Sequence, residues 1–181
     1  MKILTFGEIM LRLKTPEHLR IVQANGFEAS YGGAESNVAV SLSTLGDDAA
    51  FLTKLPDNPV GNAAFNELRR YGVDTSRILR GGPRLGIYYF EKGNDIRPTS
   101  VLYDRAGSAL AKASATEFDW EALLSGIDIF FFSGVTPAIS PSVEQAVSNA
   151  LNYCHTHGIT VICDLNYRAK MWSREKAQSV M

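Results

Sequence analysis

Two adjacent glycines, followed at once by a helical pattern, constrain this chain more than any other feature. Gly32 and Gly33 permit a tight loop and let the backbone come close to a bound molecule. Apolar residues then recur at helical spacing from Val38 to Leu45, and Gly46 stands where a helix C-cap is expected. The loop therefore leads into a helix N-terminus, whose unpaired N–H groups favour a polar or anionic ligand.

Asn37, one turn into this helix, adds hydrogen-bond donors and acceptors to the loop. An ordinary loop-to-helix junction, in which the glycines serve only turn geometry, explains the same pattern. The spacing matches neither a P-loop nor a dinucleotide-binding fingerprint. The residues of the loop alone therefore leave both interpretations open.

Composition describes a globular chain without an electrostatic footprint for nucleic acid. The 181 residues are 45% hydrophobic and 20% charged, which suffices for one sizeable core. The net charge is −1 and the basic residues are scattered, so no polyanionic partner is indicated. No signal-peptide pattern opens the chain and no apolar run has membrane-spanning length, so we expect a cytoplasmic protein without a membrane partner.

Strand and helix patterns alternate along most of the chain, which predicts an α/β fold with a parallel sheet. A short apolar strand is expected at Lys2–Phe6, and buried strands are expected at Ala49–Leu55, Ile127–Phe132 and Ile159–Cys163. Helices are expected after the glycine loop, from the Asn58-Pro59 start to Tyr71-Gly72, over Thr116–Leu124, from Ser140-Pro141 to Gly158, and from Ser173 to Met181.

Four further strands do not fit inside a parallel sheet. Leu85–Glu91 and Thr99–Tyr103 read as an antiparallel hairpin joined through Gly93-Asn94-Asp95. Met10–Lys14 alternates as a half-exposed strand, and Phe27–Tyr31 reads as another short one. We expect these strands to form a flap beside the sheet.

Polar residues follow two of the predicted parallel strands, where open α/β sheets bind ligands. Ser133-Gly134 ends one strand, and Asp164–Arg168 ends the next. A helix cap or a loop salt bridge is the alternative role for Asp164. Cys154 and Cys163 lie in apolar patterns and are therefore expected to be small buried hydrophobes. Their spacing with His155 and His157 fits no zinc-binding pattern. The two histidines are expected near a helix C-terminus.

The segment Gly32-Gly33-Ala34-x-x-Asn37-x-Ala39, with Leu45-Gly46 and later Gly61, resembles the first signature of the ribokinase-like (PfkB-type) carbohydrate kinases. The resemblance implies a three-layer α/β/α fold with a mostly parallel sheet and a small β-strand lid. Residues 1–181 would be the N-terminal part of one sugar kinase domain, with lid strands at about 10–15, 27–31, 85–92 and 99–105.

Other stretches resemble one branch, the 2-keto-3-deoxygluconate kinases. These are Tyr103–Ala109, Ser133-Gly134 and Asp164–Arg168 with Lys170-Met171-Trp172 downstream. The branch implies ATP and Mg2+ as cofactors and transfer of phosphate to the terminal hydroxyl of 2-keto-3-deoxygluconate. The substrate-binding residues implied are Glu8, Gly32, Gly33, Asn37, Tyr89, Tyr103, Arg105, Gly134 and Arg168, with Asn166 and Arg168 on the phosphate side.

The residue types suit an acid sugar. A guanidinium binds a carboxylate in a bidentate, charge-assisted way, and Arg105 is the first choice for that role. Arg168 would lie nearer the carboxylate or the transferring phosphoryl group. Tyr88 and Tyr89 point to opposite sides of a strand, and the family pattern favours Tyr89 in the pocket. Aromatic packing on the sheet is the alternative role for Tyr89 and Tyr103.

The second family signature, Asp-Thr-x-Gly-Ala-Gly-Asp, is absent from this sequence. In the family it supplies the catalytic base and an anion hole, so we expect a chain that is inactive alone, contains no catalytic base and leaves a sheet edge uncovered. The alternatives are a fructokinase or ribokinase-like enzyme for a neutral sugar and a non-catalytic sugar-binding module. A dinucleotide-binding dehydrogenase is the third and least favoured alternative. A homo-oligomer formed through the lid is also expected.

Overall fold

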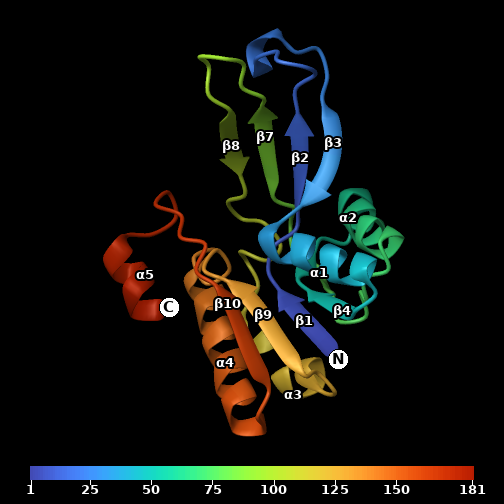
Figure 1. The fold of residues 1–181 in the computed structure, drawn as a ribbon, viewed down its shortest axis with the longest axis vertical. Coiled ribbons are helices and arrows are strands. Elements are labelled where there is room, and N and C mark those ends of the chain that lie inside the picture. Colours follow the sequence, from blue (N-terminus) through green and yellow to red (C-terminus); the bar gives the residue numbers. More distant parts are fainter.

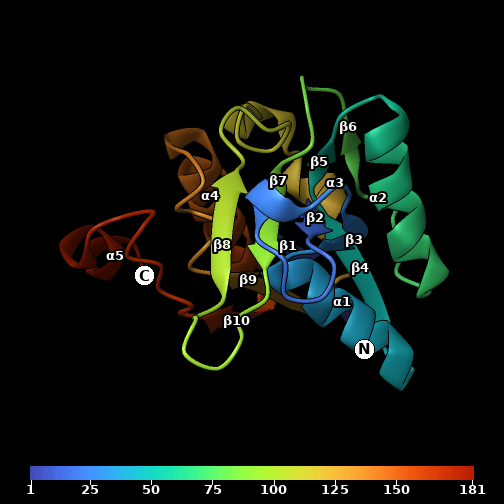
Figure 2. The same ribbon diagram turned by 90° about the horizontal axis from the view of Figure 1, so that it is seen from above.

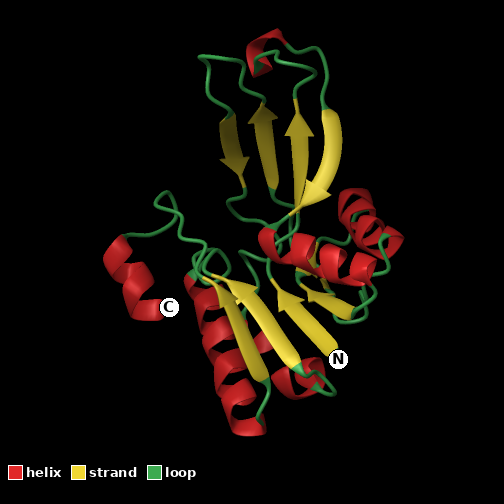
Figure 3. Ribbon diagram, viewed as in Figure 1, coloured by secondary structure: helices red, strands yellow, loops and turns green.

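The computed structural model describes residues 1–181, which form a parallel sheet flanked by helices and a second sheet standing above it (Figure 1, Figure 3). The parallel sheet has the order β10-β9-β1-β4. Its strands are Lys2–Phe6 (β1), Asp48–Leu52 (β4), Ile129–Ser133 (β9) and Thr160–Asp164 (β10). Since β1 pairs with β4 on one side and β9 on the other, the chain order reverses at β1.

The second sheet is the lid predicted from the sequence, and its order is β3-β2-β7-β8. Its strands are Met10–Lys14 (β2), Glu28–Gly32 (β3), Ile87–Glu91 (β7) and Ser100–Asp104 (β8). β2 pairs antiparallel with β3 and parallel with β7, and β7 and β8 form the expected hairpin. The lid lies beyond the carboxyl ends of β1 and β9 (Figure 1).

The helices begin and end close to the residues that the capping signals indicate. They are Ala34–Leu45 (α1), Pro59–Arg70 (α2), Trp120–Leu124 (α3), Pro141–His157 (α4) and Arg174–Val180 (α5), with 3-10 turns at Ile21–Gln23 (η1) and Ala115–Glu117 (η2). The Asn58 side chain accepts a hydrogen bond from the Gly61 N–H at 2.9 Å. Gly46 and Gly158 close α1 and α4 with φ of 95° and 69°, a left-handed conformation that glycine adopts without strain.

Helices cover both faces of the parallel sheet, which gives the predicted three-layer α/β/α arrangement. One core lies between the sheet and α3 and α4, where Phe6, Trp120 and Phe130 pack edge to face. The other lies on the opposite face under α1 and α2 and includes Phe51 and Leu68. From above, α4 and α2 lie on opposite sides of the molecule (Figure 2).

The helix α1 buries a different face from the one its apolar spacing suggests. Its buried residues are Glu35, Ser36 and Ala39, whereas Leu45 is 81% exposed. The helix packs over β4 and β1 and reaches β9, and small side chains allow this close approach. The periodicity therefore identified the helix but not its buried face.

Two predicted elements are each divided in the structure. The single strand expected over Ala49–Leu55 is wrong, because β4 ends at Leu52 and Lys54–Leu55 (β5) pairs instead with Leu79–Arg80 (β6). The single helix over Thr116–Leu124 is also wrong. The η2 turn ends at Glu117, and α3 starts anew where the Asp119 side chain accepts a hydrogen bond from the Ala122 N–H at 3.2 Å.

The strand β10 is the main departure from the predicted burial. All five of its residues are exposed, although the sequence pattern predicts a buried strand at Ile159–Cys163. It forms the free edge of the sheet, and Ile162 is 46% exposed. Cys163 is accordingly exposed, contrary to the prediction, whereas Cys154 is buried as predicted.

His155 and His157 lie in the last turn of α4, as expected. None of the helices combines the length and the hydropathy that crossing a membrane would require.

Candidate sugar-binding site

The carboxyl end of β1, the N-terminus of α1 and the base of the lid meet at one place. Glu8 follows β1, Gly33 is the N-cap of α1, and Arg105 directly follows the lid strand β8. In open parallel sheets ligands bind beside the strand at which the order reverses, and here that strand is β1. The topology therefore makes this junction the candidate site.

Glycine stands at positions 32 and 33 of the loop for different physical reasons. A Cβ on Gly33 would lie 1.9 Å from the Glu8 carbonyl oxygen, so only glycine permits this approach of the loop to β1. A Cβ on Gly32 would lie 3.2 Å from Oδ1 of Asn37. Packing alone thus accounts for Gly33, while the exposed Asn37 amide remains available beside Gly32.

Glu8 and Arg105 form an ion pair where the lid joins the sheet. The carboxylate of Glu8 is buried, and its Oε1 accepts a hydrogen bond from the Ser108 hydroxyl. Its Oε2 lies 2.5 Å from Nη2 of Arg105. The sequence predicted both residues at the site, but it assigned no role to Ser108, which lies within the Tyr103–Ala109 segment.

The guanidinium of Arg105 keeps unused donors despite this pair. Its Nε and Nη2 are buried without a well-aligned hydrogen-bond acceptor, and Nη1 contacts only the sulfur of Met171 at 3.7 Å. Buried N–H groups without acceptors are unfavourable, so an oxygen-bearing ligand would satisfy them. The Glu8 carboxylate compensates the positive charge of Arg105.

The structure places Tyr88 rather than Tyr89 on the site side of the lid, which corrects the choice made from the sequence. Tyr88 stands opposite Tyr103 in the β7–β8 register, with ring centroids 5.9 Å apart. The Tyr88 hydroxyl lies 3.9 Å from the position of a Gly32 Cβ, whereas Tyr89 packs against Phe27 on the other face. Burial raises the pKa of Tyr88, so its hydroxyl remains a hydrogen-bond donor at neutral pH.

The ends of β9 and β10 contribute the remaining predicted residues. A Cβ on Gly134 would lie 2.2 Å from the Leu165 carbonyl oxygen, so its missing side chain lets the two strand ends meet. Asn166 has a φ of 35°, and its N–H donates to Oδ1 of Asp164 at 3.1 Å. The Arg168 side chain is exposed and forms no ion pair in the structure.

Glu35 is a site residue that the sequence analysis did not single out. Its side chain is only 1% exposed, and its carboxyl group receives hydrogen bonds from Ser133 and Thr136 at the end of β9. Burial raises the pKa of this carboxyl group, although the hydrogen bonds oppose the shift. A carboxylate between Ala34 and Ser36, on a helix face of small residues, was the signal available in the sequence.

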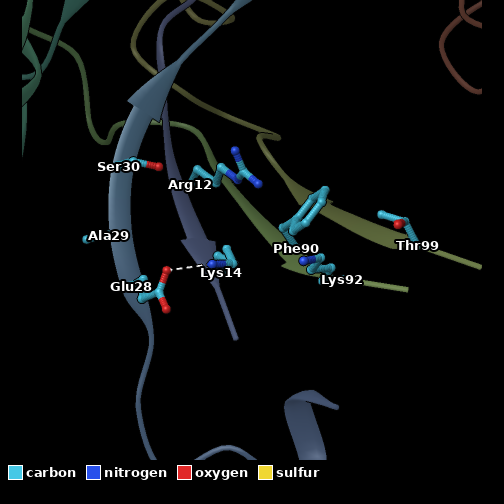
Figure 4. Close-up of a pocket in the computed structure, with 8 residues that line it drawn as sticks. All are labelled: Arg12, Lys14, Glu28, Ala29, Ser30, Phe90, Lys92 and Thr99. Atoms are coloured by element: carbon cyan, nitrogen blue, oxygen red, sulfur yellow. Dashed lines mark hydrogen bonds and ion pairs between the residues drawn. The ribbon is translucent and has the colours of Figure 1, made fainter. Parts of the chain in front are cut away.

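An open pocket of about 610 Å³ lies on the lid face that carries Tyr88, farther from the parallel sheet. In it, the Arg12 guanidinium sits 4.1 Å from the centre of the Phe90 ring, and Lys14 pairs with Glu28 at 2.7 Å (Figure 4). None of the residues predicted to bind substrate lines this pocket. The candidate site is therefore the junction below it.

The residues present do not form a site for a resident metal ion. No three His, Cys, Asp or Glu side chains converge in a way that could hold one. The Mg2+ expected from the resemblance would arrive with ATP and needs no such cluster, because Mg2+ is held mainly by phosphates and water with one or two carboxylates.

Known proteins similar to this chain are sugar kinases. A curated 2-dehydro-3-deoxygalactonokinase from Haloferax volcanii is 42% identical over 177 residues, which cover 98% of this chain and 55% of that protein. The crystal structure of a 2-dehydro-3-deoxygluconokinase from Thermotoga maritima superposes with a TM-score of 0.96 at 52% identity, covering 99% of this chain and 55% of that one. An uncharacterized sugar kinase from Pyrococcus horikoshii in complex with ATP gives a TM-score of 0.86 at 25% identity, covering 98% of this chain and 58% of that one.

The chain thus spans about half the length of the relatives it matches. The family description matched by the sequence, pfkB family carbohydrate kinase, extends over residues 1–181. The chain belongs to the pfkB family of carbohydrate kinases.

Proposed function

We propose that the protein to which these residues belong transfers phosphate from ATP to the terminal hydroxyl of 2-keto-3-deoxygluconate, and that residues 1–181 supply its sugar-binding half. The observation that carries this proposal is the Arg105 guanidinium at the junction of lid and sheet, whose buried Nε has no acceptor and whose Nη2 has only the poorly aligned Glu8 carboxylate. A substrate carboxylate fits these donors in charge and geometry. The similar proteins named as 2-dehydro-3-deoxygalactonokinase and 2-dehydro-3-deoxygluconokinase support an acid sugar.

The other groups at the junction are assigned to the hydroxyls of the sugar. The exposed Asn37 amide and the loop at Gly32 and Gly33 lie on the α1 side, and Tyr88 and Tyr103 lie on the lid side. Glu8 holds Arg105 and can accept from a hydroxyl through Oε2, which no well-aligned donor occupies. Gly134 borders the sugar, and we place Asn166 and Arg168 toward the phosphate.

Phosphoryl transfer would use these groups for positioning. An oxygen–phosphorus bond forms at the sugar hydroxyl, the bond from the γ-phosphorus to the bridging oxygen breaks, and the hydroxyl proton goes to a base. No residue in this chain is assigned as that base, so we propose that residues 1–181 alone are inactive. The ATP-bound relative supports ATP as phosphate donor. ATP would bring Mg2+ with it, and no residue of this chain is assigned to that ion.

A kinase for a neutral sugar is the second candidate, and the Glu8–Arg105 pair favours it. An arginine already neutralised by a carboxylate, 2.5 Å away, has less net charge to offer an acid. The two candidates differ in whether the substrate depends on the guanidinium. A non-catalytic sugar-binding module would bind an acid sugar without transferring phosphate.

Replacing Arg105 by methionine separates these candidates. Loss of a hydrogen-bonded charged partner costs about 1.5–3 kcal/mol, so we expect the dissociation constant for 2-keto-3-deoxygluconate to rise about 10- to 150-fold. Calorimetric titration of the full-length protein measures it, with fructose in parallel. The matched control is Arg84→Met, because Arg84 pairs with the exposed Asp104 at 2.8 Å on the other face of the lid.

Each result has a definite meaning. Tight binding of fructose that survives Arg105→Met would replace the acid-sugar proposal by the neutral-sugar one. Binding of the acid sugar without ATP-dependent turnover by the full-length protein would leave a binding module. Phosphorylation of the sugar by residues 1–181 alone would refute the proposal that these residues supply only the sugar-binding half and are inactive by themselves.

The lid is also the surface through which we propose that the full-length protein forms a homo-oligomer. Leu102, on the face opposite to Tyr88, is 58% exposed, and Ile96 at the lid tip is fully exposed. Such apolar residues on a two-sided sheet gain by contact with a second lid. A monomeric mass for the full-length protein by light scattering would refute this assembly.

A further inference from the structure

We infer that Glu35 is a positioning residue for the sugar-binding loop, because its carboxyl group clamps the first turn of α1 to the end of β9. The inference rests on the proposed function in so far as Asn37 and the loop glycines bind the sugar. Glu35 does not touch the candidate ligand groups itself. It would act through the placement of Asn37 relative to Gly134.

One carboxyl oxygen of Glu35 accepts all of its hydrogen bonds from residues at the end of β9. Oε1 of Glu35 accepts from the Ser133 N–H at 3.1 Å and from the Ser133 hydroxyl, and it lies 2.8 Å from the Thr136 hydroxyl. Ser133 ends β9 and Thr136 lies just after it, 98 and 101 residues from Glu35 in the sequence. A carboxyl group buried to this extent is tolerated only with such partners.

The same residue is tied to β1. The Glu35 carbonyl accepts a hydrogen bond from the Thr5 hydroxyl at 3.1 Å, and the Thr136 hydroxyl lies 3.1 Å from the Phe6 carbonyl oxygen. A Cβ on Gly7 would lie 2.1 Å from Oε2 of Glu35, so the chain leaves space for the carboxyl group at the end of β1. The first turn of α1 is thereby fixed to two strand ends at once.

Counting protons shows that the clamp holds whether Glu35 is charged or neutral. The Thr136 hydroxyl has one proton and two acceptors within reach, Oε1 of Glu35 and the Phe6 carbonyl. With Glu35 charged, that proton goes to Oε1. With Glu35 protonated, Glu35 donates to Thr136 and Thr136 donates to Phe6, and burial, which raises the pKa of Glu35, widens the pH range over which this second arrangement exists.

The clamp matters for the sugar because Asn37 has little else to hold it. Its side chain is exposed, and its N–H donates to the Gly33 carbonyl at 2.9 Å as part of the first helical turn. Gly33 and Asn37 flank Glu35 by two residues on either side. A shift of that turn would therefore move both groups relative to the lid and Gly134.

The test compares Glu35→Ala with Glu35→Gln in the full-length protein. Removing an acceptor that satisfies several buried donors should raise the KM for the sugar about tenfold or more in Glu35→Ala, with the KM for ATP unchanged. Glu35→Gln keeps both an acceptor and a donor and should stay within about threefold of the wild type. Glu121→Gln is the matched control, because Glu121 also lies in a first helical turn but is exposed.

Hydrogen exchange provides a second measurement that needs no substrate. Amides 34–38 should exchange faster in Glu35→Ala than in the wild type, and at near wild-type rates in Glu35→Gln. A folded Glu35→Ala protein with an unchanged sugar KM and unchanged exchange would overturn the inference. So would a Glu35→Gln protein as impaired as Glu35→Ala, because the clamp works through hydrogen bonds rather than charge.

If Glu35→Ala does not fold, the Thr136→Val variant tests the inference instead. It removes one of the partners of Oε1 and should raise the sugar KM about threefold to tenfold. An unchanged sugar KM together with unchanged exchange at amides 34–38 would overturn the clamp. A wild-type protein that phosphorylates no sugar acid would refute the proposed function instead, and the exchange comparison would still test the clamp.

Discussion

Gly33 shows at the scale of one residue why a family motif need not be a set of ligand contacts. Its Cβ position lies 1.9 Å from the Glu8 carbonyl oxygen, a backbone atom that cannot rotate away. A side chain there would have to move β1 or the start of α1. The glycine is thus required by the fold before any sugar is bound.

Gly33→Ala should consequently destabilise the chain. Forcing extra volume into a packed site costs about 1–3 kcal/mol, and the rigid neighbour places Gly33 at the upper end. Gly26→Ala is the control, because a Cβ on Gly26 meets nothing within 4 Å. Urea denaturation followed by circular dichroism gives both free energies of unfolding, and equal values would contradict the packing argument.

Tyr88 and Tyr89 allow a sharper test of the site. Tyr88→Phe should weaken binding of the acid sugar about threefold to tenfold, because one neutral hydrogen bond contributes about 0.5–1.5 kcal/mol. Tyr89→Phe should leave binding unchanged, since Tyr89 packs against Phe27 on the far face of the lid. Calorimetric titration of the full-length variants measures both, and the reverse order of effects would restore the choice made from the sequence.

The motifs predicted which residues gather at the site better than they predicted how each is used. Local sequence shows that Tyr88 and Tyr89 face opposite ways, but only the pairing of Tyr88 with Tyr103 shows which way is inward. The sequence did not identify Glu35 as a site residue because its partners, Ser133 and Thr136, are distant in sequence. Contacts of this kind are tertiary, and no local pattern records them.

At the scale of elements, capping signals and hydrophobic periods located most helices and strands. The caps at Asn58, Ser140 and Gly158 work through local hydrogen bonds and backbone conformation, so they could be read directly. Predictions failed where a neighbouring element decides. β5 does not continue β4 because it pairs with β6 instead. β10 is exposed because it is an edge strand with a neighbour on one side only.

The exposure of β10 gives a prediction on the two cysteines of this chain. Burial raises the pKa of the Cys154 thiol to about 11, and partial desolvation together with the nearby Asp164 and Glu35 carboxylates raises that of Cys163 to about 11 as well. Only Cys163 belongs to an exposed residue. The thiolate is the reactive form, so alkylation of Cys163 by iodoacetamide should speed up about tenfold per pH unit between pH 7 and 10. Cys154 should react only after unfolding. Mass spectrometry of the labelled peptides distinguishes the two, and early labelling of Cys154 would contradict its burial.

For the molecule as a whole, the parallel sheet has one edge that nothing in this chain covers. β10 presents unpaired backbone groups on its outer side, and Val161 and Ile162 beside them are 39% and 46% exposed. Natural proteins protect such edges with charges, bulges or covering elements. Residues 1–181 produced alone should therefore associate with themselves as their concentration rises.

Ile162→Lys should reduce that association, because a charged side chain at a strand edge opposes pairing with another edge. Light scattering of residues 1–181 over a range of concentrations measures the mean mass. Leu45→Lys is the matched control, since Leu45 is an apolar residue, 81% exposed, in the last turn of α1, outside both the lid and β10. If Ile162→Lys leaves the mass unchanged, or lowers it no more than Leu45→Lys does, the open edge of the sheet is not the surface through which the chain associates.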